Sequence, residues 1–343
     1  MTPKSIEQHV QNILASIERE REREIIARRY GLFDRKETLE QIGELLGITR
    51  ERVRQLEKAV MIRLRMQAEE GTVNGLQDVE AKITEKLEEI GHVARISDLT
   101  NKLLGSESTK IDQSRVAFLC ELAPGLNIIN ESDHFHHSVA VAEAHDEKSV
   151  HEHVKSIVDA IKELGEPHPI EKITEAVGHK DHKQVEALSS TSKHLATLNE
   201  LWGHIKWPTV NPKNIRDKIY VILQQSGKHM HFNEIAEAIK KSEFKRKDVT
   251  TQAIHNELIK DDRFVLIGRG IYALKEWGYK RGTVADTITE VLKGAGEPLH
   301  RDEIVKRVLK SRHVKETTIL LNLQGKKQFQ RVAKATYALA PAE

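Results

Sequence analysis

Four polar side chains stand together near the start of one predicted helix: Arg50, Glu51, Arg54 and Gln55. These residue types match the groups that read DNA, because arginine bonds guanine edges, glutamine bonds adenine and glutamate accepts from cytosine. From residue 49 to residue 65 there are six Lys or Arg against two Glu, which gives a surplus of cations for phosphates. A solvated basic face on an ordinary helical hairpin would look similar. The residue types alone leave both interpretations open.

The elements that would position these side chains form a helix-turn-helix between residues 38 and 65. Gly47 separates two apolar-periodic segments and is suited to the left-handed conformation that ends a helix. Thr38 and Thr49 are each suited to cap the helix that follows. The predicted inward faces are Leu39, Ile42, Leu45 and Leu46 in the first helix, and Val53, Leu56, Val60 and Leu64 in the second. Residues 5–30 are also predicted as helix, with the alternating charges of 18–24 on a solvated surface.

The stretch TLEQIGELLGITRERVRQLEKA closely resembles region 4 of primary bacterial sigma factors, the part that reads the promoter −35 element. The resemblance spans residues 10–66, although the loop at 33–37 is slightly shorter than usual. It implies base contacts from Arg50, Glu51 and Gln55. The phosphate-contacting residues that we predict beside them are Arg21, Arg29, Thr38, Arg52, Arg54 and Lys58.

A complete sigma factor also has a −10 binding and melting region that is rich in aromatic side chains. The residues before Arg21 contain no aromatic side chain, so we expect that the protein cannot open a promoter alone. The leading hypothesis is a regulator that binds double-stranded −35-like DNA and contacts the RNA polymerase core at its β flap. One alternative is a sigma mimic that binds polymerase without reading DNA. Another is a DNA-binding accessory of a restriction or defence system.

From residue 79 the sequence repeats four times around Gly91, Gly165, Gly227 and Gly296. In every repeat, apolar residues stand eight and four positions before the glycine and eight and twelve positions after it. The later repeats end in two short apolar runs, which predict β-hairpins. The expected fold is mainly α with small β wings: a helix-turn-helix over 1–70, then winged-helix-like units over 79–142, 150–208, 213–277 and 283–341.

The charge of the chain is divided between its parts. Residues 71–204 hold 13 Lys or Arg and 23 Asp or Glu, giving −10, whereas residues 205–343 hold 27 and 16, giving +11. The third unit also resembles the HARE-type winged helix in HFNEIAEAI and FVLIGRGIYAL, which implies a protein- or DNA-contacting module. Possible further nucleic-acid contacts, each equally explained by solvation, are Lys245, Arg246, Lys247, Arg269, Arg312, Lys326, Lys327 and Arg331.

Other function classes find little support in the sequence. There is no apolar run of membrane-spanning length, and the single Cys120 stands among apolar neighbours, as a core residue would in a reducing cytoplasm. The phosphate-loop, zinc-peptidase and nucleophile-elbow motifs are missing, so we expect neither an enzyme nor a small-molecule substrate or cofactor. The chain has 18 histidines, several clustered between 134 and 153, but they lack the spacing of zinc ligands and we predict no metal.

Overall fold

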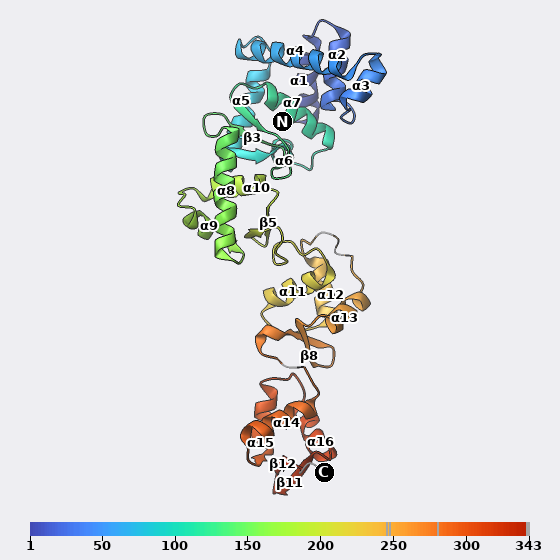
Figure 1. The fold of residues 1–343 in the computed structure, drawn as a ribbon, viewed down its shortest axis with the longest axis vertical. Coiled ribbons are helices and arrows are strands. Elements are labelled where there is room, and N and C mark those ends of the chain that lie inside the picture. The colour runs from blue at the N-terminus through green and yellow to red at the C-terminus, as the bar shows by residue number, and fades with distance from the viewer. Residues whose placement is uncertain (245, 247, 280, 341–343) are drawn as a thin grey trace. The chain divides into compact units, whose positions relative to one another are not determined.

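The computed structural model describes residues 1–340 except 245, 247 and 280 (Figure 1). The chain forms two compact units, of which the first is Met1–Lys206 and the second begins at Trp207. Both are mainly helical with small antiparallel sheets, which confirms the predicted fold class. Within the described part of the chain, no helix is long and apolar enough to cross a membrane.

The first unit opens with four helices: α1 (Pro3–Ala15), α2 (Glu20–Tyr30), α3 (Leu39–Leu46) and α4 (Arg50–Glu69). The prediction of helix throughout 5–30 is wrong between α1 and α2. The Ser16 hydroxyl donates to the Ile13 carbonyl oxygen at 2.7 Å, which satisfies an end carbonyl and closes α1. The alternating charges are also not all solvated, because Glu22 is buried.

The turn between α3 and α4 has the predicted chemistry. The Thr38 hydroxyl accepts from the Gln41 amide at 3.3 Å, and the Thr49 hydroxyl accepts from the Arg52 amide at 3.2 Å. Gly47 has φ 65° and ends α3 in the left-handed conformation. The predicted inward faces are largely buried, with the exception of Leu45, whose exposed fraction is 55%. Local capping and a narrow apolar stripe therefore determine this helix-turn-helix.

Each of the four repeats contains a helix, a strand, two helices and a hairpin, in that order. In every sheet the third strand lies between the other two and pairs antiparallel with both, which is the arrangement of a winged helix. The first repeat comprises α5 (Leu76–Ile90), β1 (Val93–Arg95), α6 (Ile96–Leu104), α7 (Lys110–Leu122), β2 (Leu126–Ile129) and β3 (Ser138–Val141). The second comprises α8 (Glu147–Leu164), β4 (His168–Pro169), α9 (Ile170–Ala176), α10 (His182–Thr191), β5 (Leu195–Leu198) and β6 (Leu201–His204).

The remaining two repeats lie in the second unit. The third comprises α11 (Ile215–Ser226), β7 (Met230–His231), α12 (Phe232–Lys241), α13 (Thr251–Lys260), β8 (Phe264–Gly268), β9 (Ile271–Leu274) and the 3-10 turn η1 (Lys275–Trp277). The fourth comprises α14 (Val284–Ala295), β10 (Leu299–His300), α15 (Arg301–Leu309), α16 (Glu316–Gly325), β11 (Phe329–Ala333) and β12 (Thr336–Leu339). The hairpins expected from the two apolar runs are present in both repeats.

The helix-turn-helix segment and the first repeat share one hydrophobic core. Helix α7 packs against α1, α2 and α4 (Figure 1). Its Phe118 side chain is fully buried. The Phe118 ring meets the Tyr30 ring edge-on, with 5.1 Å between centroids. Arg115 of α7 donates to the Leu32 carbonyl oxygen at 2.8 Å and pairs with Glu7 at 3.1 Å. The third helix of this winged-helix unit is therefore a structural support for the preceding helices.

The third helix of the second repeat is also covered within the first unit. Helix α10 packs against β1, and the His136 amide donates to the Thr191 carbonyl oxygen at 2.8 Å. The Arg95 guanidinium donates to the Ser190 carbonyl oxygen beside it. Gly91, with φ 105°, permits this approach, because a Cβ there would lie 2.6 Å from the Lys183 carbonyl oxygen. The third helix of the second repeat thus joins this repeat to the sheet of the first repeat.

The repeats of the second unit are joined by a different contact. The buried Arg312 guanidinium donates to the Leu266 carbonyl oxygen at 2.8 Å and to the Thr287 hydroxyl at 3.1 Å, and it also bonds the Gly282 carbonyl oxygen. The prediction that Arg312 is a nucleic-acid contact is therefore wrong. The carbonyl oxygens that it bonds belong to Leu266 and Gly282, which are distant in the sequence, so the residues next to Arg312 could not indicate these bonds.

Candidate nucleic-acid interface

The side chains predicted to read bases lie on the solvent face of α4. Val53 and Val60 are buried on one side of this helix, so the helical repeat places Glu51 and Gln55 on the other, and Arg50 is exposed beside them in the first turn. The side chain of Arg50 is 67% exposed. Thr49 caps the helix immediately before these residues, and this fixes the direction in which its first two turns point. The structure therefore brings the three predicted base-reading residues onto one accessible surface.

The exposed side chains of α4 also bond to one another. Arg54 donates to both carboxylate oxygens of Glu51, at 2.7 and 2.9 Å, and these bonds hold the pKa of the Glu51 carboxyl below its ordinary value. Arg52 donates to the Gln55 amide oxygen at 3.3 Å. Arg50 pairs with Glu40 of α3 at 3.0 Å. Such solvent-exposed pairs are weak, so DNA groups could replace them.

The predicted phosphate contacts divide into free and occupied groups. Thr38 is exposed at the start of α3, although its hydroxyl accepts from the Gln41 amide. Lys58 is exposed on α4. The Arg29 guanidinium, in contrast, pairs with Glu57 at 3.3 Å and donates to the Glu37 carbonyl oxygen at 3.4 Å. The Arg21 guanidinium donates to the Leu46 carbonyl oxygen. Arg29 and Arg21 therefore also hold the helices of this segment together.

One partly buried ion pair of this domain was not predicted from the sequence. Glu22 accepts from Arg63 of α4 at 2.6 Å and pairs with Arg19 at 3.5 Å. Arg63 lies 41 residues further along the chain, so the alternating charges near Glu22 could not reveal the pairing. The bond fixes the angle at which α4, and with it the candidate DNA-reading face, leaves the helix bundle.

The possible secondary contacts are more dispersed. Lys245 and Lys247 lie outside the described residues. The remaining cations of the predicted set are exposed: Arg246, Arg269, Lys326, Lys327 and Arg331. None of these cations lies within the third helices α13 and α16, whose Lys and Arg residues amount to Lys260 alone. The surplus charge of the last third is therefore not concentrated on the helices that commonly enter a DNA groove.

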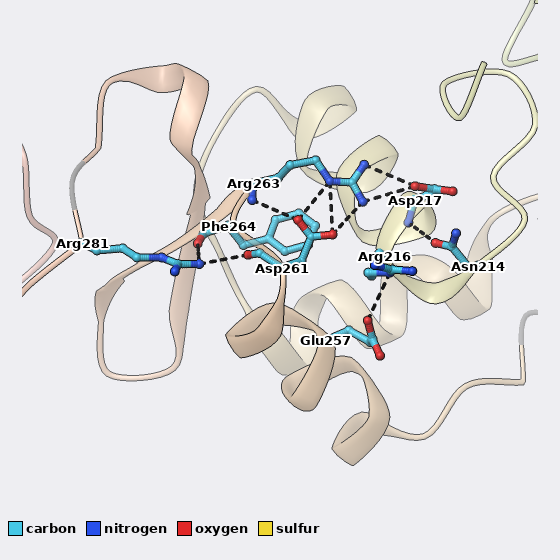
Figure 2. Close-up of polar contacts among 8 residues, drawn as sticks. All are labelled: Asn214, Arg216, Asp217, Glu257, Asp261, Arg263, Phe264 and Arg281. Atoms are coloured by element: carbon cyan, nitrogen blue, oxygen red, sulfur yellow. Dashed lines mark hydrogen bonds and ion pairs between the residues drawn. The ribbon is translucent and has the colours of Figure 1, made fainter. Parts of the chain in front are cut away.

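Several basic residues of the third repeat are occupied by its own carboxylates. Figure 2 shows Arg263 between Asp261 and Asp217. The nitrogen–oxygen distances of these ion pairs are 2.8 and 3.2 Å, respectively. Arg216 pairs with Glu257 of α13 at 3.4 Å. Arg281, from the segment before α14, donates to the Asp261 carbonyl oxygen at 3.1 Å. This cluster stabilises the repeat and leaves fewer cations for phosphate than the formal charge implies.

The clustered histidines lie mostly at the junction between the first two repeats. His134 Nδ1 is 2.7 Å from His194 Nε2, and His145 Nε2 is 2.7 Å from Gln184 Nε2. Phe135 stacks on His151, with 4.1 Å between ring centroids. Burial lowers the pKa of His145 and of His194 below the ordinary value. The imidazoles of His145 and His194 therefore act as neutral packing and hydrogen-bonding groups at neutral pH.

Comparison with known proteins supports the interpretation of the N-terminal helices. Residues 19–66 match the family model for sigma-70, region 4. The RNA polymerase sigma factor SigA1 of Synechococcus elongatus is 52% identical over 46 residues, which cover 13% of this chain and 12% of that protein. The RNA polymerase sigma factor SigA of Microcystis aeruginosa is 41% identical over 61 residues, which cover 18% and 14%.

SigA of Synechocystis is also 41% identical over 61 residues. The chain thus spans only about one seventh of the length of the curated relatives that it matches. The similarity coincides with α2, α3 and α4, where the exposed polar face was found. Residues 19–66 form a sigma-70 region 4 helix-turn-helix domain.

Proposed function

We propose that this protein is a DNA-binding transcription regulator that recognises a −35-like promoter element through its region 4 domain and contacts RNA polymerase. The observation that carries this proposal is the free face of α4, on which Arg50, Glu51 and Gln55 are all exposed within a domain that matches region 4. Major-groove recognition requires such polar side chains at the start of the second helix of a helix-turn-helix. The scaffold residues behind this face are buried, so the helix is presented rigidly.

The test is a mobility-shift titration of the full chain on a −35-like duplex and on a scrambled duplex, at two salt concentrations. Arg50→Ala and Gln55→Ala should each weaken specific binding by about 1–3 kcal/mol, because each removes a base-edge contact. Binding to the scrambled duplex should change less, since it depends on phosphate contacts.

The matched control is Lys155→Ala, which removes an exposed cation from α8 without touching the region 4 domain. It should bind both duplexes as the unaltered protein does. If Arg50→Ala and Gln55→Ala leave the preference for the −35-like duplex intact, then direct readout by α4 is incorrect.

A second candidate function is a sigma mimic that binds polymerase without reading DNA. It is favoured by the acidic charge of residues 71–204 and by the burial of α7 and α10, which removes two potential DNA-reading helices. Purified core polymerase separates the candidates. Binding to core polymerase, together with equal affinity for −35-like and scrambled duplexes, would favour the mimic. We also propose that the third repeat is a HARE-type winged helix that serves as a further protein- or DNA-contacting module.

A further inference from the structure

A basic groove of about 810 Å³ lies between the region 4 domain and the first winged-helix repeat. Four segments of the first unit form its walls: the loop before α3, the start of α6, the first turns of α7, and the β2–β3 loop with Glu131, His136 and His137. Its cations are Arg35, Lys36, Arg95 and Lys110. None of these residues was predicted as a contact, because they come from segments that are distant in the sequence.

The groove is positively charged although the surrounding segment is acidic. Its carboxylates are Asp34 and Glu131, so four cations face two anions. Glu131 is already paired with Lys193 at 2.8 Å. Arg35, Lys36 and Lys110 are exposed side chains on the rim, where a polyanion could reach them. This arrangement attracts a negatively charged backbone more than an isolated small anion, since its cations are spread over three segments.

Two helix ends lie at the groove, and each carries a carboxylate in its first turn, Asp98 in α6 and Asp112 in α7. Helices α6 and α7 both begin at the groove, and the partial positive charge of a helix lies at this end. The start of α7 is capped by the Thr109 side chain, which accepts from the Asp112 amide at 3.1 Å. The start of α6 has no side-chain cap, because Arg95 occupies that position. The first-turn carboxylates offset the helix-end charge, so the four side-chain cations supply the positive potential of the groove.

The position of the groove along the chain connects it with the helix-turn-helix. Lys36 is two residues before Thr38, so their Cα atoms are at most about 7 Å apart. Thr38 caps α3, the first helix of the motif, and in such motifs this helix crosses the DNA backbone. Arg29 holds the same loop in place through the Glu37 carbonyl oxygen. A duplex bound by α4 would therefore bring phosphates towards the loop that forms one wall of the groove.

We propose that this groove binds the phosphate backbone of DNA beside the −35-like element, so that the region 4 domain and the first winged-helix repeat form one continuous DNA-binding surface. The inference rests on the proposed DNA-reading function and adds to it the role of the first repeat. In this repeat α7 packs in the core and does not enter a DNA groove. The proposed contact with DNA comes instead from the cations on the rim of the basic groove. Residues 71–204, although acidic overall, thus contribute to one local binding site for a polyanion.

The test compares two duplexes in an anisotropy titration of the full chain over 50–200 mM salt. One duplex holds only the −35-like element, and the other extends it by about one helical turn, roughly 10 base pairs, on both sides. The variant Lys36→Gln/Lys110→Gln should reduce the salt dependence on the extended duplex by about two phosphate contacts, which is about a tenfold smaller loss of affinity over this range. On the short duplex it should match the unaltered protein.

The matched control is Lys102→Gln/Lys155→Gln, which removes two exposed cations of the same unit outside the groove. It should keep the full salt dependence on both duplexes. Circular dichroism spectra that match the unaltered protein would show that the groove variant is folded. Arg35→Gln/Lys36→Gln provides a second variant that leaves α7 untouched.

Distinct results would overturn the two proposals. A groove variant with unchanged salt dependence on the extended duplex, or with the same reduction on both duplexes, would refute the groove as a flanking site. The flanking-site proposal would also be refuted if the groove variant lost binding to a polyglutamate peptide while its affinity for DNA was unchanged. That result would assign the groove to acidic protein segments. Failure of the unaltered chain to prefer −35-like over scrambled DNA would refute specific reading, while the groove would still be tested on the extended scrambled duplex. Absence of any duplex binding would refute both.

Discussion

Replacement of Phe118 by alanine tests whether the region 4 domain and the first winged-helix repeat fold as one body. Phe118 is fully buried in α7 and meets Tyr30 of α2 edge-on at 5.1 Å. Removing a buried phenyl ring costs about 3–5 kcal/mol, because the transfer free energy is lost and a cavity remains. Since 1.4 kcal/mol corresponds to a factor of ten, exchange-competent opening should become at least about 100-fold more frequent.

The assay is hydrogen exchange followed by mass spectrometry on the full chain. If the core is shared, backbone amides of α1, α2 and α4 should lose protection together with those of α7, although the substitution is in the winged-helix repeat. The matched control is Phe264→Ala, an equally drastic change in the buried core of the second unit. It should leave protection in residues 1–142 unchanged. Faster exchange confined to residues 79–142 in Phe118→Ala would refute the shared core.

Three further predictions concern acid, thiol reactivity and the joint of the second unit. Burial lowers the pKa of His145 and of His194, so the neutral imidazoles stabilise the fold above pH 6.5. This stability should be lost as the pH falls below 6.5, because the unfolded chain then binds more protons. Equal melting temperatures by circular dichroism at pH 7.5 and 5.5 would contradict this prediction. Burial raises the pKa of the Cys120 thiol, so a thiol reagent should titrate no group in the native chain and one after denaturation, and rapid native labelling would contradict that packing. Arg312→Ala should destabilise the second unit by about 1–3 kcal/mol in urea unfolding, because buried carbonyl oxygens lose their donor, whereas Arg269→Ala, an exposed change in the adjacent wing turn, should have little effect.

The sequence alone determined the local architecture of this protein. Thr38, Gly47 and Thr49 stand at the ends of α3 and α4 because capping depends on residues only a few positions apart. The same holds for the four repeats, whose apolar periodicity and glycine turns specify helices and hairpins without reference to distant residues. The exposed face of α4 followed from the apolar stripe on its other side.

Only the tertiary structure decided what the repeats pack against. Periodicity shows which face of a helix is apolar, but not which partner covers it. In α7 one signal was available, since the continuous apolar run from Val116 to Cys120 is wider than a single stripe and indicates a helix covered on several sides. In α10 no such signal exists, because Ser189 and Thr191 are fully buried and satisfy their hydroxyls on the helix's own carbonyl oxygens.

The charges depended on the fold in the same way. Arg312 and Arg263 have the same residue type as a phosphate contact, yet their neighbours in space are carbonyl oxygens and carboxylates. Lys36 and Lys110 have the same type again, and the fold brings them to one open groove. A side chain's charge is a property of the sequence, whereas the groups it faces are set by long-range packing. The sequence therefore determined which elements and which charges exist, and the tertiary structure determined which of those charges are free to meet DNA.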